Sequence, residues 1–458
     1  MVKDLTTGSP ARLIIGFSLP LLAGNLFQQF YSMADTIVVG RSIGVDALAA
    51  VGSTGAISFL VLGFVIGLTG GFSVVVAQKF GAGDEREVRR AVAMSVYLSV
   101  LLTIVLTAVS VLCTRPLLNF MQTPANIYDD AYAYIVVIFA GTGAIIFYNL
   151  LSGVLRALGD SRTPLYFLIL SSVINVALDL VFILVFGMGV AGAAYATVAA
   201  QVLSGLLCLL YMAKKFPILR FHKSDWAWNG RLVVHHLRLG LPMAFQFSVT
   251  AIGVMILQGA INGFGSSVVA GYTAASKVEQ LTTQPMMTFG ITMATYGGQN
   301  LGAGRLDRIR QGTRRCVEIS TVVNLACAAL VAFLGKYLVR LFLSSDNAEE
   351  LAAATDAAIQ YMNTIAVFFV VLGLLFIFRN VLQGVGSTLV PLLAGFIELV
   401  MRTAVVFTLP RYIGYTGVCL ANPVAWIGAT IPLVIAYLFV MRRMERRQRA
   451  EATMSEHL

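Results

Sequence analysis

The sequence predicts an all-α polytopic membrane protein, in which twelve transmembrane helices form two pseudo-symmetric six-helix lobes. Three observations carry this prediction. The composition is strongly apolar, long apolar runs recur along the whole chain, and the second half repeats sequence motifs of the first half.

The composition places the chain in the membrane class. Hydrophobic residues make up 58% of the 458 residues and charged residues only 12%, and the mean hydropathy is +0.83. A soluble domain carries about 25% charged residues. No stretch of the sequence has the composition of a separate soluble domain.

Each apolar run contains about 20 residues or more, which is enough to cross a hydrocarbon core of about 30 Å as a helix. We expect twelve spans, at residues 12–38, 47–78, 91–113, 131–155, 164–186, 190–212, 238–262, 267–298, 316–343, 357–383, 390–410 and 416–441.

Basic residues gather in alternate loops and at both termini. Arginine and lysine mark the loops at 79–90, 156–162 and 305–315, the segment at 213–238, and the tail from 442 to 449. The opposite loops hold only Arg41, Arg115, Lys336, Arg340 and Arg411. Since cytoplasmic loops carry the excess of Lys and Arg, both termini are expected in the cytoplasm. This distribution explains the net charge of +10 without a nucleic-acid partner.

The two halves repeat. QKFGAGDEREVRR at 78–90 matches QNLGAGRLDRIRQ at 299–311, VLRALGDSRTP at 154–164 matches VLQGVGSTLVP at 381–391, and GVAGAAYATVAA at 189–200 matches GYTGVCLANPVA at 414–425. Six helices in each half predict a parallel repeat, an arrangement in which transporters rock one lobe against the other. The expected parts are an N-terminal lobe over 1–212, a cytoplasmic linker over 213–237, a C-terminal lobe over 238–442 and a basic cytoplasmic tail over 443–458.

Asp179 is the most informative single residue, because an ionisable group in a membrane helix is costly and marks a functional site by default. Asn175 precedes it by four residues and shares its helix face. If Gly187 and Gly189 form a tight turn between two antiparallel helices, Asp179 and Thr197 both lie about 12 Å from that turn.

Two further polar residues are expected near the same depth. Asp35 lies five residues before Gly40, at the outer end of the first helix, and Tyr134 lies at the outer start of the fourth. Carboxylate, amide, hydroxyl and phenol oxygens suit either sodium or a shared proton, since neighbouring carboxylates raise one another's pKa. Hydrogen bonding between helices is the alternative role of such polar residues.

The second lobe lacks this set at the matching positions. The repeat pairs Tyr134 with Tyr361, Asn175 with Arg402 and Asp179 with Val406. A cation site is therefore expected in the N-terminal lobe alone.

The stretches NVALDLVFILVFGMGVAGAAYATVAAQ and SLPLLAGNLFQQFYSMADTIVVG and the paired QxxGAG loops resemble the multidrug and toxic compound extrusion (MATE) family of bacteria, over essentially the whole chain. The resemblance implies a twelve-helix antiporter of the bacterial inner membrane that expels organic, often cationic, compounds in exchange for Na⁺ or H⁺. It also implies that Asp35, Tyr134, Asn175, Asp179 and Thr197 form the cation-binding site, with Asp35, Asn175, Asp179 and Thr197 as the ligands if the ion is sodium.

The same resemblance assigns Pro20 to bending of the first helix, and Pro242 is its repeat mate. Proline bends a helix because its ring removes a hydrogen bond and clashes with the preceding turn. One branch of the family carries extra acids in helices seven and ten. Here the spans 238–262 and 357–383 have none, so a sodium site in the C-terminal lobe is not expected.

Other polar and adaptable residues in the spans are expected to line a substrate cavity. The set is Asn25, Gln28, Gln29, Met33, Gln246, Glu279, Met286, Glu398 and Arg402. Glu279 either faces a cationic substrate or pairs within the lobe. Glu398 and Arg402 are four residues apart and are expected to neutralise one another, in a structural or a substrate-contacting role.

Two other functions compete with the antiporter. A lipid-linked saccharide flippase would need several arginines in its cavity, and only Arg379 and Arg402 lie in the spans. A membrane enzyme would need a motif such as HExxH or GxSxG, and neither occurs. The five cysteines have no metal-ligand spacing, and His235 and His236 are expected to be solvated linker residues. We expect a monomer that is not an enzyme, with no cofactor beyond its coupling ion. The sequence does not distinguish sodium from protons and does not name the substrates.

Overall fold

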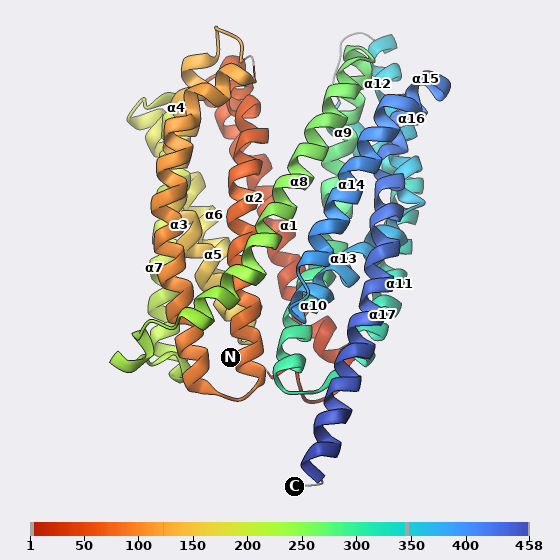
Figure 1. The fold of residues 1–458 in the computed structure, drawn as a ribbon. Helices are drawn as coiled ribbons and strands as arrows, with labels where there is room; N and C mark the ends of the chain where they lie inside the picture. The colour runs from red at the N-terminus through yellow and green to blue at the C-terminus, as the bar shows by residue number, and fades with distance from the viewer. Residues whose placement is uncertain (1–3, 122, 344–347, 457–458) are drawn as a thin grey trace. The chain divides into compact units, whose positions relative to one another are not determined.

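The computed structural model describes residues 4–121, 123–343 and 348–456, although a few side chains within these ranges are not placed. Every regular element in the described ranges is helical (Figure 1).

The chain forms two compact units. Unit 1 contains Met1–Asp4 and Leu19–Ser248, and unit 2 contains Leu5–Ser18 and Val249–Leu458. The start of the first helix therefore belongs to the unit built mainly from the second half of the chain. The first half of the helix after the linker belongs to the other unit.

Unit 1 is built from the longer part of α1 and the elements up to the middle of α8. These elements are α1 Pro10–Ser42, α2 Val45–Gly81, α3 Glu85–Phe120, α4 Tyr128–Ala140, α5 Thr142–Ala157, α6 Arg162–Leu180, the π-helix η1 Val181–Val185, α7 Gly189–Lys215, the short 3₁₀ helices η2 Pro217–Leu219 and η3 Lys223–Trp226, and α8 Gly230–Asn262.

Unit 2 contains the start of α1, the end of α8 and all later helices. These are α9 Ser266–Thr282, α10 Gln284–Gly302, α11 Leu306–Arg340, α12 Ala348–Ala366, α13 Phe369–Gly384, α14 Leu389–Thr408, α15 Pro410–Ile413, α16 Tyr415–Cys419 and α17 Ala421–Glu456.

Eleven of the twelve predicted spans have a counterpart among the described helices that could cross a membrane. In the described part of the chain, nine helices are long and apolar enough to cross a membrane, and two bent pairs raise the number to eleven. The pairs are α4 with α5, bent by 47°, and α12 with α13, bent by 54°. The predicted span at 267–298 is helical as α9 and α10, which are interrupted at Thr283. The two bent pairs occupy equivalent positions of the repeat, so the repeat extends to helix shape.

The paired QxxGAG loops end and restart helices in the same way. Gly83 and Gly304 have φ of +74° and +69°, a region that side chains other than glycine enter at a cost. In the first loop, Asp84 caps α3 by accepting a hydrogen bond of 2.9 Å from the backbone N–H of Glu87.

Contact between two backbones holds the first half of α8 in unit 1. A Cβ atom on Gly71 of α2 would lie 2.4 Å from the Cα of Gly240, and one on Gly67 would lie 2.6 Å from the Cα of Ala244. Small residues at such a crossing let membrane helices approach closely. This part of α8 therefore packs as an integral helix of unit 1.

The linker is also part of unit 1. Asp225 is buried and accepts a 2.9 Å hydrogen bond from the Arg89 side chain on α3. His235 and His236 lie in α8, and the prediction that both are solvated linker residues was wrong. His236 is fully buried, 3.0 Å from the Ser95 hydroxyl and 2.8 Å from the Leu232 carbonyl.

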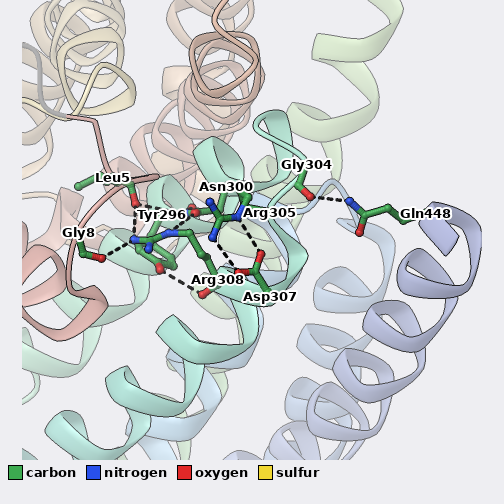
Figure 2. Close-up of polar contacts among 9 residues, drawn as sticks. All are labelled: Leu5, Gly8, Tyr296, Asn300, Gly304, Arg305, Asp307, Arg308 and Gln448. Carbon is green, nitrogen blue, oxygen red and sulfur yellow. Dashed lines mark hydrogen bonds and ion pairs between the residues drawn. The ribbon is translucent and has the colours of Figure 1, made fainter. Parts of the chain in front are cut away.

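The start of the chain is bound to unit 2 by a polar cluster (Figure 2). Arg308 donates hydrogen bonds to the carbonyl oxygens of Gly8, at 3.0 Å, and Leu5, at 3.4 Å, and to the Asn300 side chain, at 3.1 Å. The backbone N–H of Leu5 donates to the side chain of Gln299 at 2.9 Å. Gln299 and Asn300 belong to the second QxxGAG loop, so this repeat motif anchors the chain's start.

Candidate functional site

The predicted hairpin carries the central residues of the site. Gly187 and Gly189 adopt φ of +62° and +59°, and α6 with η1 returns into α7 across them, as expected. The π-helix η1 begins two residues after Asp179. A single π turn inside a helix frequently marks a functional site.

Three side chains of unit 1 form a hydrogen-bonded chain. The Tyr31 hydroxyl of α1 donates to Asn175 Oδ1 at 2.5 Å, and Asn175 Nδ2 donates to the Thr197 hydroxyl at 3.2 Å. The Thr197 hydroxyl donates onward to the Ala193 carbonyl at 3.1 Å. The structure therefore brings two of the predicted site residues together and adds Tyr31.

Asp179 follows Asn175 by one turn of α6, and both side chains are buried, with exposed fractions of 0% and 1%. A buried carboxylate is stable only when a counter-charge or a proton compensates the loss of water. Asp179 is the only acidic residue in the sequence of the hairpin from 162 to 215, so it is the candidate residue for a change of charge at this site.

Tyr134 of α4 packs over the same end of the hairpin. Its ring contacts a cluster that includes Val39 of α1 with Val190 and Ala193 of α7. Asp35 lies outside the residues whose side chains the structure describes, so its place in the site remains a prediction. The described site thus draws on α1, α4, α6 and α7.

The matching positions of unit 2 are also joined by hydrogen bonds. The Tyr361 hydroxyl donates to Glu279 Oε2 at 2.9 Å and accepts from Asn422 Nδ2 at 2.9 Å. Tyr361 is the repeat mate of Tyr134, and Asn422 is the mate of Thr197. The acid in this group is Glu279, which comes from α9. The position that matches Asp179 in the repeat is Val406, which is not acidic.

Glu398 lies between two arginines. It accepts hydrogen bonds of 2.8 Å from Arg379 and from Arg402, and all three side chains are buried. The predicted pairing of Glu398 with Arg402 is confirmed and extended to a group of three. The Arg402 guanidinium fits over Gly253 of α8, where a Cβ atom would clash with it.

The remaining cavity candidates differ in exposure. On α1, Gln28 is exposed, while Asn25, Gln29 and Met33 are half-buried. Elsewhere, Gln246 is buried and Met286 is fully buried in α10. Pro20 and Pro242 lie inside α1 and α8, which continue through them as helices.

Sequence reasoning missed Tyr31, Arg379 and Asn422 as members of these groups. Extending the repeat alignment to Thr197 would have identified Asn422. Tyr31 precedes Asp35 by four residues on α1, which places both on one helix face. No comparable signal marked Arg379 as a partner of Glu398.

No group of three or more His, Cys, Asp or Glu side chains lies close enough to hold a metal in the described part of the chain. An ion at the hairpin would therefore rely on the oxygens of Asp179, Asn175 and Thr197. Such oxygen donors suit a hard cation rather than a transition metal.

Comparison with known proteins identifies the class. The sequence model of the MatE family matches residues 20–181 and 242–408, so this chain belongs to the MATE family of membrane transporters. It is 30% identical to the probable multidrug resistance protein YpnP of Bacillus subtilis over 95% of this chain and 96% of that protein. It is 26% identical to the probable multidrug resistance protein NorM of Thermotoga maritima, over 92% of this chain and 89% of that protein.

A solved structure agrees in fold. The outward-facing structure of a multidrug resistance MATE transporter of the MOP superfamily superimposes with a TM-score of 0.89 at 25% identity, over 96% of this chain and 98% of that one. The family and the fold expected from the sequence are both confirmed.

Proposed function

We propose that this protein is a multidrug efflux antiporter that exports amphipathic organic cations in exchange for sodium or protons. The observation that carries the coupling role is the fully buried Asp179, one turn from the Tyr31–Asn175–Thr197 hydrogen-bonded chain. The names of the relatives support the class of transport.

The site performs the exchange through its charge. When a proton or a sodium ion neutralises Asp179, the carboxylate can stay buried among the hairpin helices. When the ion leaves, the ionised group is stabilised by water or by a rearrangement of its neighbours, because an uncompensated charge at this depth is costly. Occupied and empty sites therefore favour different arrangements of α1, and Pro20 supplies the weak point in that helix.

The substrate is recognised in part by Glu279. Its side chain is half-buried, one oxygen accepts the Tyr361 hydrogen bond, and no ion pair engages it within the described residues. A carboxylate in this state attracts the positive group of an organic cation. Glu398 offsets one of the two positive charges of Arg379 and Arg402, which weakens the repulsion between these arginines and a cation.

We infer the orientation of the chain with support from contacts within unit 2. Leu5 and Gln448 both contact the loop region between α10 and α11, so the two ends of the chain lie on one side of this unit (Figure 2). The density of Lys and Arg on that side makes it cytoplasmic. We infer a multi-pass protein of the bacterial plasma membrane with both termini inside.

The flippase alternative is weaker. A cavity that binds a lipid-linked saccharide phosphate needs several arginines that face the ligand, whereas Arg379 and Arg402 each donate a hydrogen bond to the buried Glu398. The membrane-enzyme alternative is also weaker, because the sequence contains neither an HExxH nor a GxSxG motif. Small organic molecules remain the proposed substrates of a monomeric transporter.

The test is dye efflux from proteoliposomes under separately imposed sodium and proton gradients. Wild-type protein is expected to respond to one gradient, whereas Asp179→Asn and Asp35→Asn abolish the response. Asp130→Asn, which changes an exposed acid at the start of α4, is the matched control. If both site variants kept gradient-driven efflux, the proposed coupling site would be wrong.

A further inference from the structure

The last turns of α17 carry five arginines with exposed side chains: Arg442, Arg443, Arg446, Arg447 and Arg449. The positive-inside rule accounts for basic residues at this end of the chain, but it requires only their presence. The structure adds that they lie on an ordered helix, which extends past the neighbouring helices of its unit (Figure 1).

This helical extension has two different faces. At 100° per residue, the five arginines cover one side of the helix, and Met444, Glu445 and Gln448 fall on the other. Glu445 pairs with Arg310 of α11 at 2.7 Å, and Gln448 donates to the Gly304 carbonyl at 2.7 Å. Figure 2 shows Gln448 beside Gly304, in the loop that leads through Arg305 into α11. The helix is therefore held by one face and presents the arginines on the other.

The five arginines have no acidic partner within the described residues, in contrast to their neighbours. Arg305 pairs with Asp307, and Arg314 and Arg315 both pair with Glu318. Glu451 follows Arg447 by one turn, yet no ion pair joins them. Five positive charges on one ordered face are left for a partner outside the chain.

The position of this face indicates what the partner is. The apolar part of α17 ends at Met441, and the exposed Phe439 precedes the first arginine by three residues. Along this side of α17, Phe439 and Val440 are followed directly by Arg442, Arg443, Arg446 and Arg447, and these residues border one continuous open surface. An apolar surface joined directly to guanidinium groups matches a phospholipid, which joins acyl chains to a phosphate. Arginine binds phosphate oxygens with paired donors.

We propose that the basic face of α17 is a binding site for anionic phospholipid headgroups of the cytoplasmic leaflet. Glu445 and Gln448 orient the helix so that its arginines lie at headgroup level. The site would select phosphatidylglycerol-like lipids over zwitterionic ones. It is independent of the ion and the drug at the transport sites.

Electron paramagnetic resonance with spin-labelled lipids tests the proposal on the full chain in phosphatidylcholine vesicles. The fraction of label that the protein immobilises is compared for phosphatidylglycerol and phosphatidylcholine. We expect about a fivefold preference for phosphatidylglycerol at low salt, which corresponds to the surface attraction of about one basic residue. In about 1 M salt, the ratio of immobilised phosphatidylglycerol to phosphatidylcholine should fall toward one, because salt at this concentration screens the attraction between exposed charges.

The variant R442Q/R443Q/R446Q/R447Q should lose the preference. The control K214Q/K215Q/R220Q/K223Q removes the same charge from exposed positions that run from the end of α7 to the start of η3, and it should keep the preference. If both variants lost the preference for phosphatidylglycerol equally, the overall charge of the protein would explain it, and the proposal would be overturned. Displacement of the labelled lipid by an equal concentration of inorganic phosphate would also overturn it, in favour of a soluble anion. If the fourfold variant does not fold, R446Q/R447Q and the salt series on wild type decide the question.

Discussion

Replacing Glu398 with glutamine should destabilise unit 2 more than any single arginine replacement beside it. Glu398 is 5% exposed, and its two carboxylate oxygens each accept a 2.8 Å bond from Arg379 or Arg402, which are 5% and 4% exposed. Glutamine cannot balance the two guanidinium charges, which then remain buried and uncompensated. Removing one partner of a buried ion pair costs about 3–5 kcal/mol. Arg379→Met leaves one acid facing one base and should cost less.

The expected loss corresponds to a fall in melting temperature of roughly 6–20 °C, since about 1 kcal/mol shifts a domain of this size by about 2–4 °C. A thiol-reactive dye can follow unfolding, because Cys316 and Cys419 in this unit are buried. Cys316→Ser and Cys419→Ser backgrounds would show which thiol reports. A melting temperature of Glu398→Gln within about 2 °C of wild type, or one above that of Arg379→Met, would refute the reasoning.

Three further predictions follow from contacts elsewhere in the chain. Gly71→Ala should lower the melting temperature by several degrees, because its Cβ would lie 2.4 Å from the Gly240 backbone, while Gly52→Ala, with open space around it, should have little effect. Arg308→Ala should release the chain's start from unit 2, and faster hydrogen exchange at Leu5–Ser18 without a change in α17 would show this. Burial raises the pKa of Asp225, but hydrogen bonds from the His222 backbone and from Arg89 outweigh it and hold this pKa below its usual value. Docking of the linker is therefore complete above about pH 4 and weakens as the pH falls through the lowered pKa of Asp225. Fluorescence of the linker tryptophans, measured against pH in wild type and in Asp225→Asn, should show this transition. A transition in wild type above about pH 5 would contradict the prediction.

Much of the fold could be predicted because membrane helices are encoded locally. Apolar runs, prolines and the glycine-rich loops define the spans, and the positions of the paired QxxGAG motifs reveal the repeat. The hairpin turn at Gly187 also followed from the sequence. Equal distances from that turn predicted that Asp179 lies at the depth of Thr197, whereas the structure hydrogen-bonds Thr197 to Asn175, one helical turn away. The breaks inside α4–α5 and α12–α13 did not, since neither span contains a proline that would predict a bend.

The sequence by itself determined the class of protein, its spans and the residue types of the unit 1 site, because these depend on hydropathy and on spacing within one helix or one hairpin. The tertiary structure alone decided which distant helices meet. It joins Tyr31 to Asn175 and Tyr361 to Glu279, and it places Leu5–Ser18 in the unit formed by the second half of the chain. These contacts depend on how helices far apart in sequence pack side by side. A repeat alignment finds that Asp179 has no acidic mate in the second half, but only packing shows that Glu279 reaches the equivalent place from another helix.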